Sequence, residues 1–168
     1  MNNIILVGFS QSGKTTIGKL LAERTQQTFI ELEEDFQKEH QKSIKELVDE
    51  VGEVEFREME KGFLEKMMCK KNKVIIVRSD TIVNEDVASV LPKIGTVVYL
   101  QTDKEELKRR LEAGVEKGII EAEEQLNEEK ISKQIAKIEP LFFKVASIII
   151  QTAGKTPEEI VNEIQLLI

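Results

Sequence analysis

A glycine-rich turn near the start of the chain has the residue types and spacing needed to bind a phosphate. The turn from Gly8 to Thr16 reads G-F-S-Q-S-G-K-T-T and fits the pattern G-x-x-x-x-G-K-[ST]. In such a turn successive backbone N–H groups surround a phosphate, and the lysine, here Lys14, reaches the outer phosphates of a nucleotide. The hydroxyl of Thr15 can then ligate a Mg²⁺ ion between the β- and γ-phosphates of ATP. The residues predicted to bind the nucleotide are Gly8, Ser10, Gln11, Ser12, Gly13, Lys14, Thr15 and Thr16.

The alternative is a glycine-punctuated turn that binds nothing, and the flanking segments help to decide. The run from Asn3 to Val7 reads as a short buried strand. After the turn, Ile17, Leu20 and Leu21 recur at helical spacing, which predicts a helix over residues 14–25. A strand before the turn and a helix after it are the context that this motif requires. We therefore favour phosphate binding.

Further apolar runs predict the sheet that would hold this turn. The runs at 74–77 and 95–100 lack alternation, as expected for strands buried on both faces. Strands are predicted at 3–7, 28–30, 74–77, 95–100 and 146–150, and helices at 14–25, 53–70, 84–91 and 127–144. Capping-box patterns starting at Ser43 and Thr102 predict two more helices, and Thr156 followed by Pro157 at the first helical position predicts the final one. This alternation predicts one domain over residues 1–168, a three-layer α/β/α fold of the P-loop kinase type, with about five parallel strands and helices on both faces.

Composition restricts the classes of partner. The net charge of −7 over 168 residues argues against general nucleic-acid binding, which needs clustered Lys and Arg. The single cysteine, Cys69, permits no intramolecular disulfide and fits a reducing compartment. No apolar run approaches membrane-spanning length, and we do not expect a secretory signal. We expect a cytoplasmic monomer that binds small molecules, without nucleic-acid or membrane partners.

Charged residues gather where the predicted parallel strands end, which is where ligands bind in such folds. Glu31 and Glu33 follow the second strand at a spacing that could place them on one face, and Asp80 follows the third strand. Arg57 lies on the helix between these strands. Each has an ordinary alternative: the glutamates could be a solvated helix face, and Arg57 could be the surface partner of Glu53 or Glu60. Asp80 could be an acid near Mg²⁺ or a residue that caps the following segment.

Taken together, these motifs resemble shikimate kinase, a small P-loop kinase of the nucleoside-monophosphate kinase type. The resemblance runs nearly end to end. Besides the phosphate-binding turn and the acidic pair, it includes G-E-x-x-F-R-x-x-E at 52–60, V-V-Y-L at 97–100, P-L-F at 140–142 and T-x-x-x-x-P-E-E at 152–159. It implies transfer of the ATP γ-phosphate to a hydroxyl of shikimate or of a related small hydroxylated acid. The segment at 52–60 is the most telling, because P-loops occur in many unrelated families.

The resemblance also implies roles for individual residues. Lys14, Glu33 and Lys117 match catalytic positions, with Glu33 contacting the acceptor hydroxyls and Lys117 matching an arginine of a mobile lid, here about 112–126. Thr15 and Glu31 match the magnesium site, and Arg57 matches the arginine that grips the acceptor carboxylate. Arg110 matches a nucleotide-side arginine, and Lys155 belongs to the turn expected against the adenine. We place Asp80 beside the acceptor with Glu33 and Arg57.

Departures from the family pattern leave alternatives open. Gln11 stands where many small-kinase loops carry glycine, and Ser79-Asp80-Thr81 replaces three consecutive glycines. Ile138 replaces a second carboxylate-binding arginine, with Lys137 one residue away. One alternative is a nucleotide-binding module that has lost phosphotransfer. Another is a kinase that phosphorylates a different small polyol.

Overall fold

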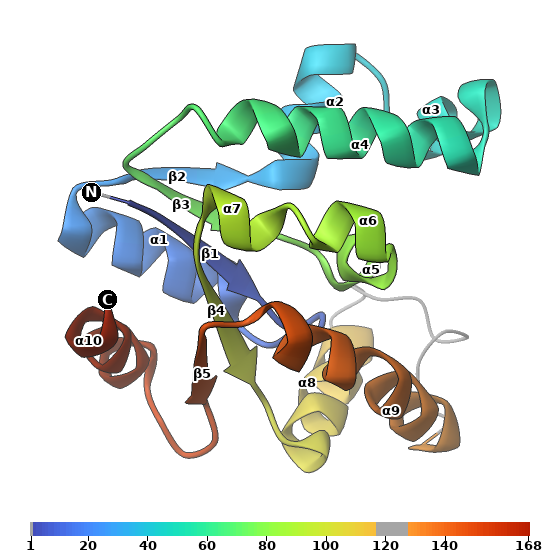
Figure 1. The fold of residues 1–168 in the computed structure, drawn as a ribbon. Helices are drawn as coiled ribbons and strands as arrows, with labels where there is room; N and C mark the ends of the chain where they lie inside the picture. Colours follow the sequence, from blue (N-terminus) through green and yellow to red (C-terminus); the bar gives the residue numbers. More distant parts are fainter. Residues whose placement is uncertain (1, 117–127) are drawn as a thin grey trace.

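The protein, seen as a computed structural model that describes residues 2–116 and 128–168, is built on a parallel sheet (Figure 1). Its strands are ordered β2-β3-β1-β4-β5, so the sheet confirms the predicted fold class. The elements are β1 (Asn3–Val7), α1 (Lys14–Thr25), β2 (Thr28–Glu31), α2 (Leu32–His40), α3 (Ile44–Val51), α4 (Glu53–Met67), β3 (Lys73–Ile76), α5 (Ser79–Val83), α6 (Glu85–Ala88), α7 (Leu91–Ile94), β4 (Gly95–Gln101), α8 (Lys104–Glu116), α9 (Glu128–Val145), β5 (Ile148–Gln151) and α10 (Pro157–Leu167).

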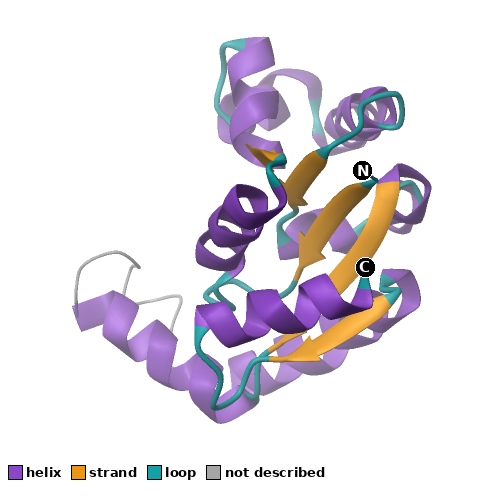
Figure 2. Ribbon diagram, turned by 90° about the vertical axis from the view of Figure 1, so that its left-hand side faces the viewer, coloured by secondary structure: helices purple, strands orange, loops and turns teal. Residues whose placement is uncertain are grey.

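The two faces of the sheet bury two separate sets of apolar side chains. Successive residues of a strand point to opposite faces, so Ile4 and Leu6 face one layer of helices and Ile5 and Val7 face the other. Helices α1 and α10 cover the first face, while α2 to α7, with α9, cover the second. Helices therefore flank the strands on both sides (Figure 2). This double covering explains why the strand sequences are apolar without alternation.

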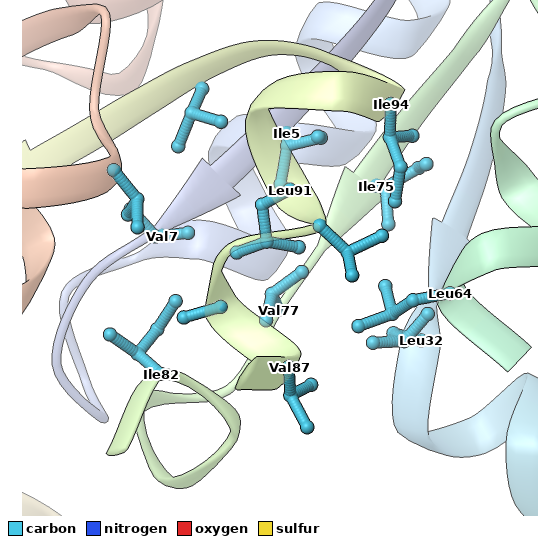
Figure 3. Packing of buried hydrophobic residues seen from close by; sticks show 14 of the residues in the cluster. Ile5, Val7, Leu32, Leu64, Ile75, Val77, Ile82, Val87, Leu91 and Ile94 are labelled. Atoms are coloured by element: carbon cyan, nitrogen blue, oxygen red, sulfur yellow. The ribbon is translucent and has the colours of Figure 1, made fainter. Parts of the chain in front are cut away.

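The larger core lies under the short helices that follow β3. Leu91 and Ile94 of α7 pack over Ile5 and Ile75 of the sheet, and Val87 lies nearby (Figure 3). Leu91 is completely buried. Packing against the sheet therefore holds these four- and five-residue helices, which are too short to be stable alone.

Asn3 fixes the central strand to both of its neighbours. Its side-chain amide donates hydrogen bonds to the carbonyl oxygens of Lys70 (2.7 Å) and Ile94 (3.2 Å). Its Oδ1 accepts a hydrogen bond from the backbone N–H of Lys73 at 3.0 Å. The register that results pairs Ile4 with Val74 of β3 and with Thr96 of β4, so the carboxyl ends of the three strands meet at one edge.

The capping-box predictions meet different outcomes. Ser43 forms a complete capping box at the start of α3, as predicted, and Thr156, which was predicted to begin the final helix, also forms one at the start of α10. The prediction for Thr102 is wrong, because its hydroxyl lies 3.0 Å from that of Thr152 across the sheet. Asp103 takes its place and accepts a hydrogen bond from the backbone N–H of Glu106 at 2.8 Å, near the start of α8.

The segment expected to form a lid divides into two parts. Residues 112–116 form the last part of helix α8. The remaining lid residues, Lys117 included, lie outside the described residues. Within 2–116 and 128–168, no helix has both the length and the apolar composition needed to cross a membrane.

Candidate active site

The glycine-rich turn joins β1 to the start of α1 at the carboxyl edge of the sheet. Gly13 caps α1 with φ near 89°, a left-handed conformation that favours glycine. Gly8 lies against the neighbouring strand, where an added Cβ would come within 2.9 Å of the carbonyl oxygen of Leu100. Both positions are therefore restricted to glycine by local geometry. Gln11 also has a left-handed φ of 66°, which explains why related loops favour glycine there.

Lys14 is buried in the turn and holds its two ends together. Its Nζ donates hydrogen bonds to the carbonyl oxygens of Gly8 and Phe9, each at 2.7 Å, and lies 3.5 Å from the hydroxyl of Ser12. Burial lowers the pKa of Lys14 to about 8, and the positive charge of Arg78 adds to this effect while Asp80 opposes it. Burial thus disfavours the positive charge of the ammonium group, which an anionic ligand would stabilise.

Thr15 and Glu31 bring two oxygen ligands together beside Lys14. The Thr15 hydroxyl donates a hydrogen bond of 2.7 Å to Oε1 of Glu31, which is the last residue of β2. Hydroxyl and carboxylate oxygens are the donors that Mg²⁺ accepts in nucleotide sites, where phosphate oxygens and water complete the octahedron. This pair therefore fits the magnesium site predicted from Thr15 and Glu31.

An open cleft of about 570 Å³ lies over the turn and α1. Its charged lining among the described residues comprises Lys14, Arg78, Arg110 and Glu31, so it is locally positive in a chain of net charge −7. The other lining residues are Ser10, Gln11, Gly13, Thr15, Thr16, Ile76 and Ser79. An excess of cations in a concave site favours polyphosphate.

Arg110 reaches this cleft from α8 and braces the turn. Its Nε donates a hydrogen bond to Glu106 at 2.6 Å, and one terminal nitrogen donates to the carbonyl oxygen of Gln11 at 2.9 Å. Of the other residues predicted to bind the nucleotide, Gly8 and Ser12 are buried within the turn. Lys155 is paired with Glu163 at 2.5 Å and is not among the described residues that line the cleft.

A second and much smaller cavity adjoins the cleft between α2, α4 and α5. Its volume is about 20 Å³, which is room for about one water molecule. Its charged lining contains Glu33, Arg57 and Asp80, the three residues predicted to bind the acceptor, together with Glu60 and Arg78. The structure therefore brings the predicted acceptor residues together around one cavity, where each of them is ion-paired with Glu60 or with Arg78.

Glu60 organises one side of this small cavity. It is 8% exposed and accepts two hydrogen bonds, from Arg57 at 2.8 Å and from the hydroxyl of Thr81 at 2.7 Å. Arg57 also pairs with Glu53 at 3.2 Å. The helical neighbours considered for Arg57 from the sequence are thus its actual partners, and they hold its guanidinium at the cavity.

Arg78 organises the other side. One of its terminal nitrogens lies 2.7 Å from Oε2 of Glu33, and its Nε donates to Asp80 at 3.3 Å. Burial raises the pKa of Glu33, and Asp80 raises it further, while Arg78 acts in the opposite direction. Asp80, the second residue of α5, also accepts a hydrogen bond from the backbone N–H of Thr81 at 3.1 Å, but the N-cap of this helix is Arg78.

One expectation about this region is wrong. Glu31 and Glu33 do not share a face, because the chain turns into α2 directly after Glu31. Glu31 faces the cleft and Glu33 faces the small cavity. After β3, helix α5 begins at Ser79. Ile138 is 6% exposed and packs in the larger core, while Lys137 is exposed, so neither is among the residues that line the small cavity.

Sequence patterns did not single out Glu60 or Arg78 as site residues. Glu60 had a signal in its spacing, since it lies one turn after Arg57 on the same helix. Arg78 had only its place at the end of β3, and its partners come from two other elements of the chain. A strand-end arginine has no motif of its own.

Comparison with known proteins gives a consistent answer. The family model described as shikimate kinase matches residues 10–168. Shikimate kinase from Persephonella marina is 35% identical over 164 residues, covering 98% of this chain and 97% of the relative. Shikimate kinase from Acinetobacter baumannii, solved in complex with shikimate, superposes with a TM-score of 0.82 at 27% identity and covers 99% of this chain and 92% of that one. The enzyme from Aquifex aeolicus gives 0.77 at 29% identity, with 98% and 94% coverage. The chain therefore belongs to the shikimate kinase family of ATP-dependent kinases.

Proposed function

We propose that the protein transfers the γ-phosphate of ATP to a hydroxyl of shikimate or of a closely related hydroxylated acid. The observation that carries this proposal is the adjacency of two sites. A cleft that presents Lys14, Thr15 and Glu31 opens beside a cavity that contains Glu33 and Arg57. Phosphoryl transfer depends mainly on placing donor and acceptor in line and on neutralising charge, and this adjacency supports both.

On the donor side, Lys14 would exchange its two carbonyl partners for phosphate oxygens. Its ammonium already lies within the turn whose backbone N–H groups surround the phosphates, so little rearrangement is required. Thr15 and Glu31 would hold Mg²⁺, which neutralises charge on the β- and γ-phosphates when it is bound. Arg110 would keep the turn in shape through the carbonyl of Gln11 and would face the nucleotide.

On the acceptor side, Glu33 would orient the attacking hydroxyl and accept its proton. Burial raises its pKa, and a carboxylate of raised pKa is a better base near neutral pH. Arg57, oriented by Glu60, would bind the carboxylate of the acceptor through its planar guanidinium. Asp80 would lie at the mouth of the same cavity. Because the cavity holds only about 20 Å³, the acceptor must displace ion-paired side chains as it enters.

Other assignments stay predictions. Lys117, which matches the lid arginine, would neutralise the phosphoryl group in transfer. Lys155 would lie near the adenine, and its pairing with Glu163 leaves it beside the start of α10. The monomeric state and the cytoplasmic location are proposed on composition alone.

A coupled assay of ADP release with shikimate tests the proposal. Turnover with shikimate that requires Mg²⁺ and is abolished in Lys14→Met would support it. Lys19→Met is the matched control, because Lys19 is an exposed lysine on the same helix. Turnover with another hydroxylated acid but not with shikimate would exclude shikimate as the acceptor and still support kinase activity. Nucleotide binding by calorimetry without turnover on any hydroxylated acid or sugar would favour a binding module.

A further inference from the structure

Arg78 has a position that no other described residue shares. It is the one described residue that lines both the nucleotide cleft and the small acceptor cavity. It follows directly after the buried Val77 at the end of β3 and caps α5 in an extended conformation, with φ near −74° and ψ near 157°. Its backbone is therefore fixed at the sheet edge, while its side chain, 59% exposed, extends between the two sites.

The surroundings of Arg78 tie its charge to both reacting partners. The positive charge of Arg78 lowers the pKa of Lys14, in addition to the larger effect of burial. The two cations are therefore close enough to interact electrostatically. On the other side its terminal nitrogen is 2.7 Å from Glu33, the proposed base. A guanidinium located between the phosphate-binding lysine and the base lies where the phosphoryl group must pass.

We infer that Arg78 is a catalytic residue of this chain that binds the phosphoryl group during its transfer and gives up its ion pair with Glu33 to do so. The inference rests on the proposed function. In the step itself, the acceptor oxygen forms a bond to the γ-phosphorus as the bond from that phosphorus to the ADP oxygen breaks. The acceptor proton passes to the Glu33 carboxylate, and the guanidinium of Arg78 faces the three equatorial oxygens.

The exchange of partners has a physical rationale. The pair with Glu33 uses one terminal nitrogen and the pair with Asp80 uses Nε, so Glu33 is not held in a bidentate fork. A phosphoryl group carries more charge than one carboxylate and attracts the guanidinium more strongly. Movement of Arg78 towards the phosphate also vacates the cavity and leaves Glu33 available to the acceptor hydroxyl. One residue thereby couples nucleotide binding to opening of the acceptor site.

The test compares Arg78→Ala and Arg78→Lys with wild type and with Arg24→Ala, a control arginine on α1 that pairs with Asn162. We measure kcat with shikimate. We also measure by calorimetry the affinity for MgADP alone and for MgADP with aluminium fluoride, a mimic of the phosphoryl group in transfer. Arg78→Ala should lower kcat on the order of 100-fold, with a partial loss in Arg78→Lys. It should weaken the fluoroaluminate complex far more than MgADP alone.

The outcomes separate this inference from the proposed function. An unchanged or raised kcat in Arg78→Ala, with a lower KM for shikimate, would mean that Arg78 only blocks the cavity and would overturn the inference. Equal losses for MgADP and for the fluoroaluminate complex would overturn it as well. If wild type lacks turnover with shikimate but the fluoroaluminate complex still depends on Arg78, the proposed acceptor fails and the role of Arg78 stands.

Discussion

Glu60 provides a sharp test of how the acceptor cavity is held together. The change Glu60→Gln keeps the shape of the side chain but removes its charge. Its amide would still accept from Thr81 and would turn an N–H group towards Arg57, so one charge-assisted hydrogen bond of 2.8 Å is lost. Such a bond contributes about 1.5–3 kcal/mol. Glu53 would still attract Arg57, but its side chain is 64% exposed, so it would replace little of the lost interaction.

The expected result is a lower free energy of unfolding and a weaker acceptor site. Urea unfolding followed by circular dichroism should show a loss of about 1.5–3 kcal/mol, which corresponds to roughly 3–12 °C in Tm for a domain of this size. The KM for shikimate should rise about tenfold, because about 1.4 kcal/mol of binding is lost when Arg57 is no longer oriented. The KM for ATP should stay the same.

Glu58→Gln is the matched control, because Glu58 is exposed on the same helix, and its stability should stay within about 0.5 kcal/mol of wild type. If Glu60→Gln unfolds at the same urea concentration as wild type, the buried network contributes nothing to the fold. If stability falls while the KM for shikimate is unchanged, Arg57 does not depend on Glu60 to bind the acceptor.

Four further predictions concern the phosphate-binding turn and glycine positions. ATP affinity should fall as pH rises above about 8, because Lys14, with its pKa lowered from 10.5 to about 8, loses its proton, and calorimetry in Lys14→Met should lose this dependence. In free wild type the same shift should raise the free energy of unfolding between about pH 8 and 10.5, since the unfolded chain keeps the proton longer. Gln11→Gly should raise stability by about 0.5–1 kcal/mol by relieving a φ of 66°, and an unchanged Tm would contradict this. Gly8→Ala should lower stability by about 1–3 kcal/mol because its Cβ meets the carbonyl of Leu100, whereas Gly62→Ala, with nothing within 4 Å, should raise it by up to about 1 kcal/mol.

Local patterns predicted the parts of the site that depend on local geometry. The turn from Gly8 to Thr15 has a fixed spacing because the backbone itself forms the phosphate site, so sequence alone located it. The acidic strand end and the spacing of Arg57 on α4 likewise placed side chains near the correct edge. These features need only the strand, the turn and the helix that contain them.

Tertiary contacts decided what local patterns could not. Thr102 stands in a capping-box sequence, but its hydroxyl forms a hydrogen bond with that of Thr152, fifty residues later. Arg78 obtained its position from the order of the strands, which places the end of β3 between β2 and β1. The sequence predicted Glu33 as a site residue. It did not predict that Glu33 and Glu31 lie in different cavities, because this depends on where α2 begins.

The central place of β1 also affects how the chain becomes folded during synthesis. The residues that pair with Ile4 in the neighbouring strands are Val74 and Thr96, some seventy and ninety residues further along the chain. Pairings over such distances form slowly, because a long loop must close before any contact compensates for it. On the ribosome, we therefore expect the segment from Gly8 to Thr15 to acquire its final shape only after β4 has emerged and docked, so ATP retention by stalled nascent chains should report sheet closure.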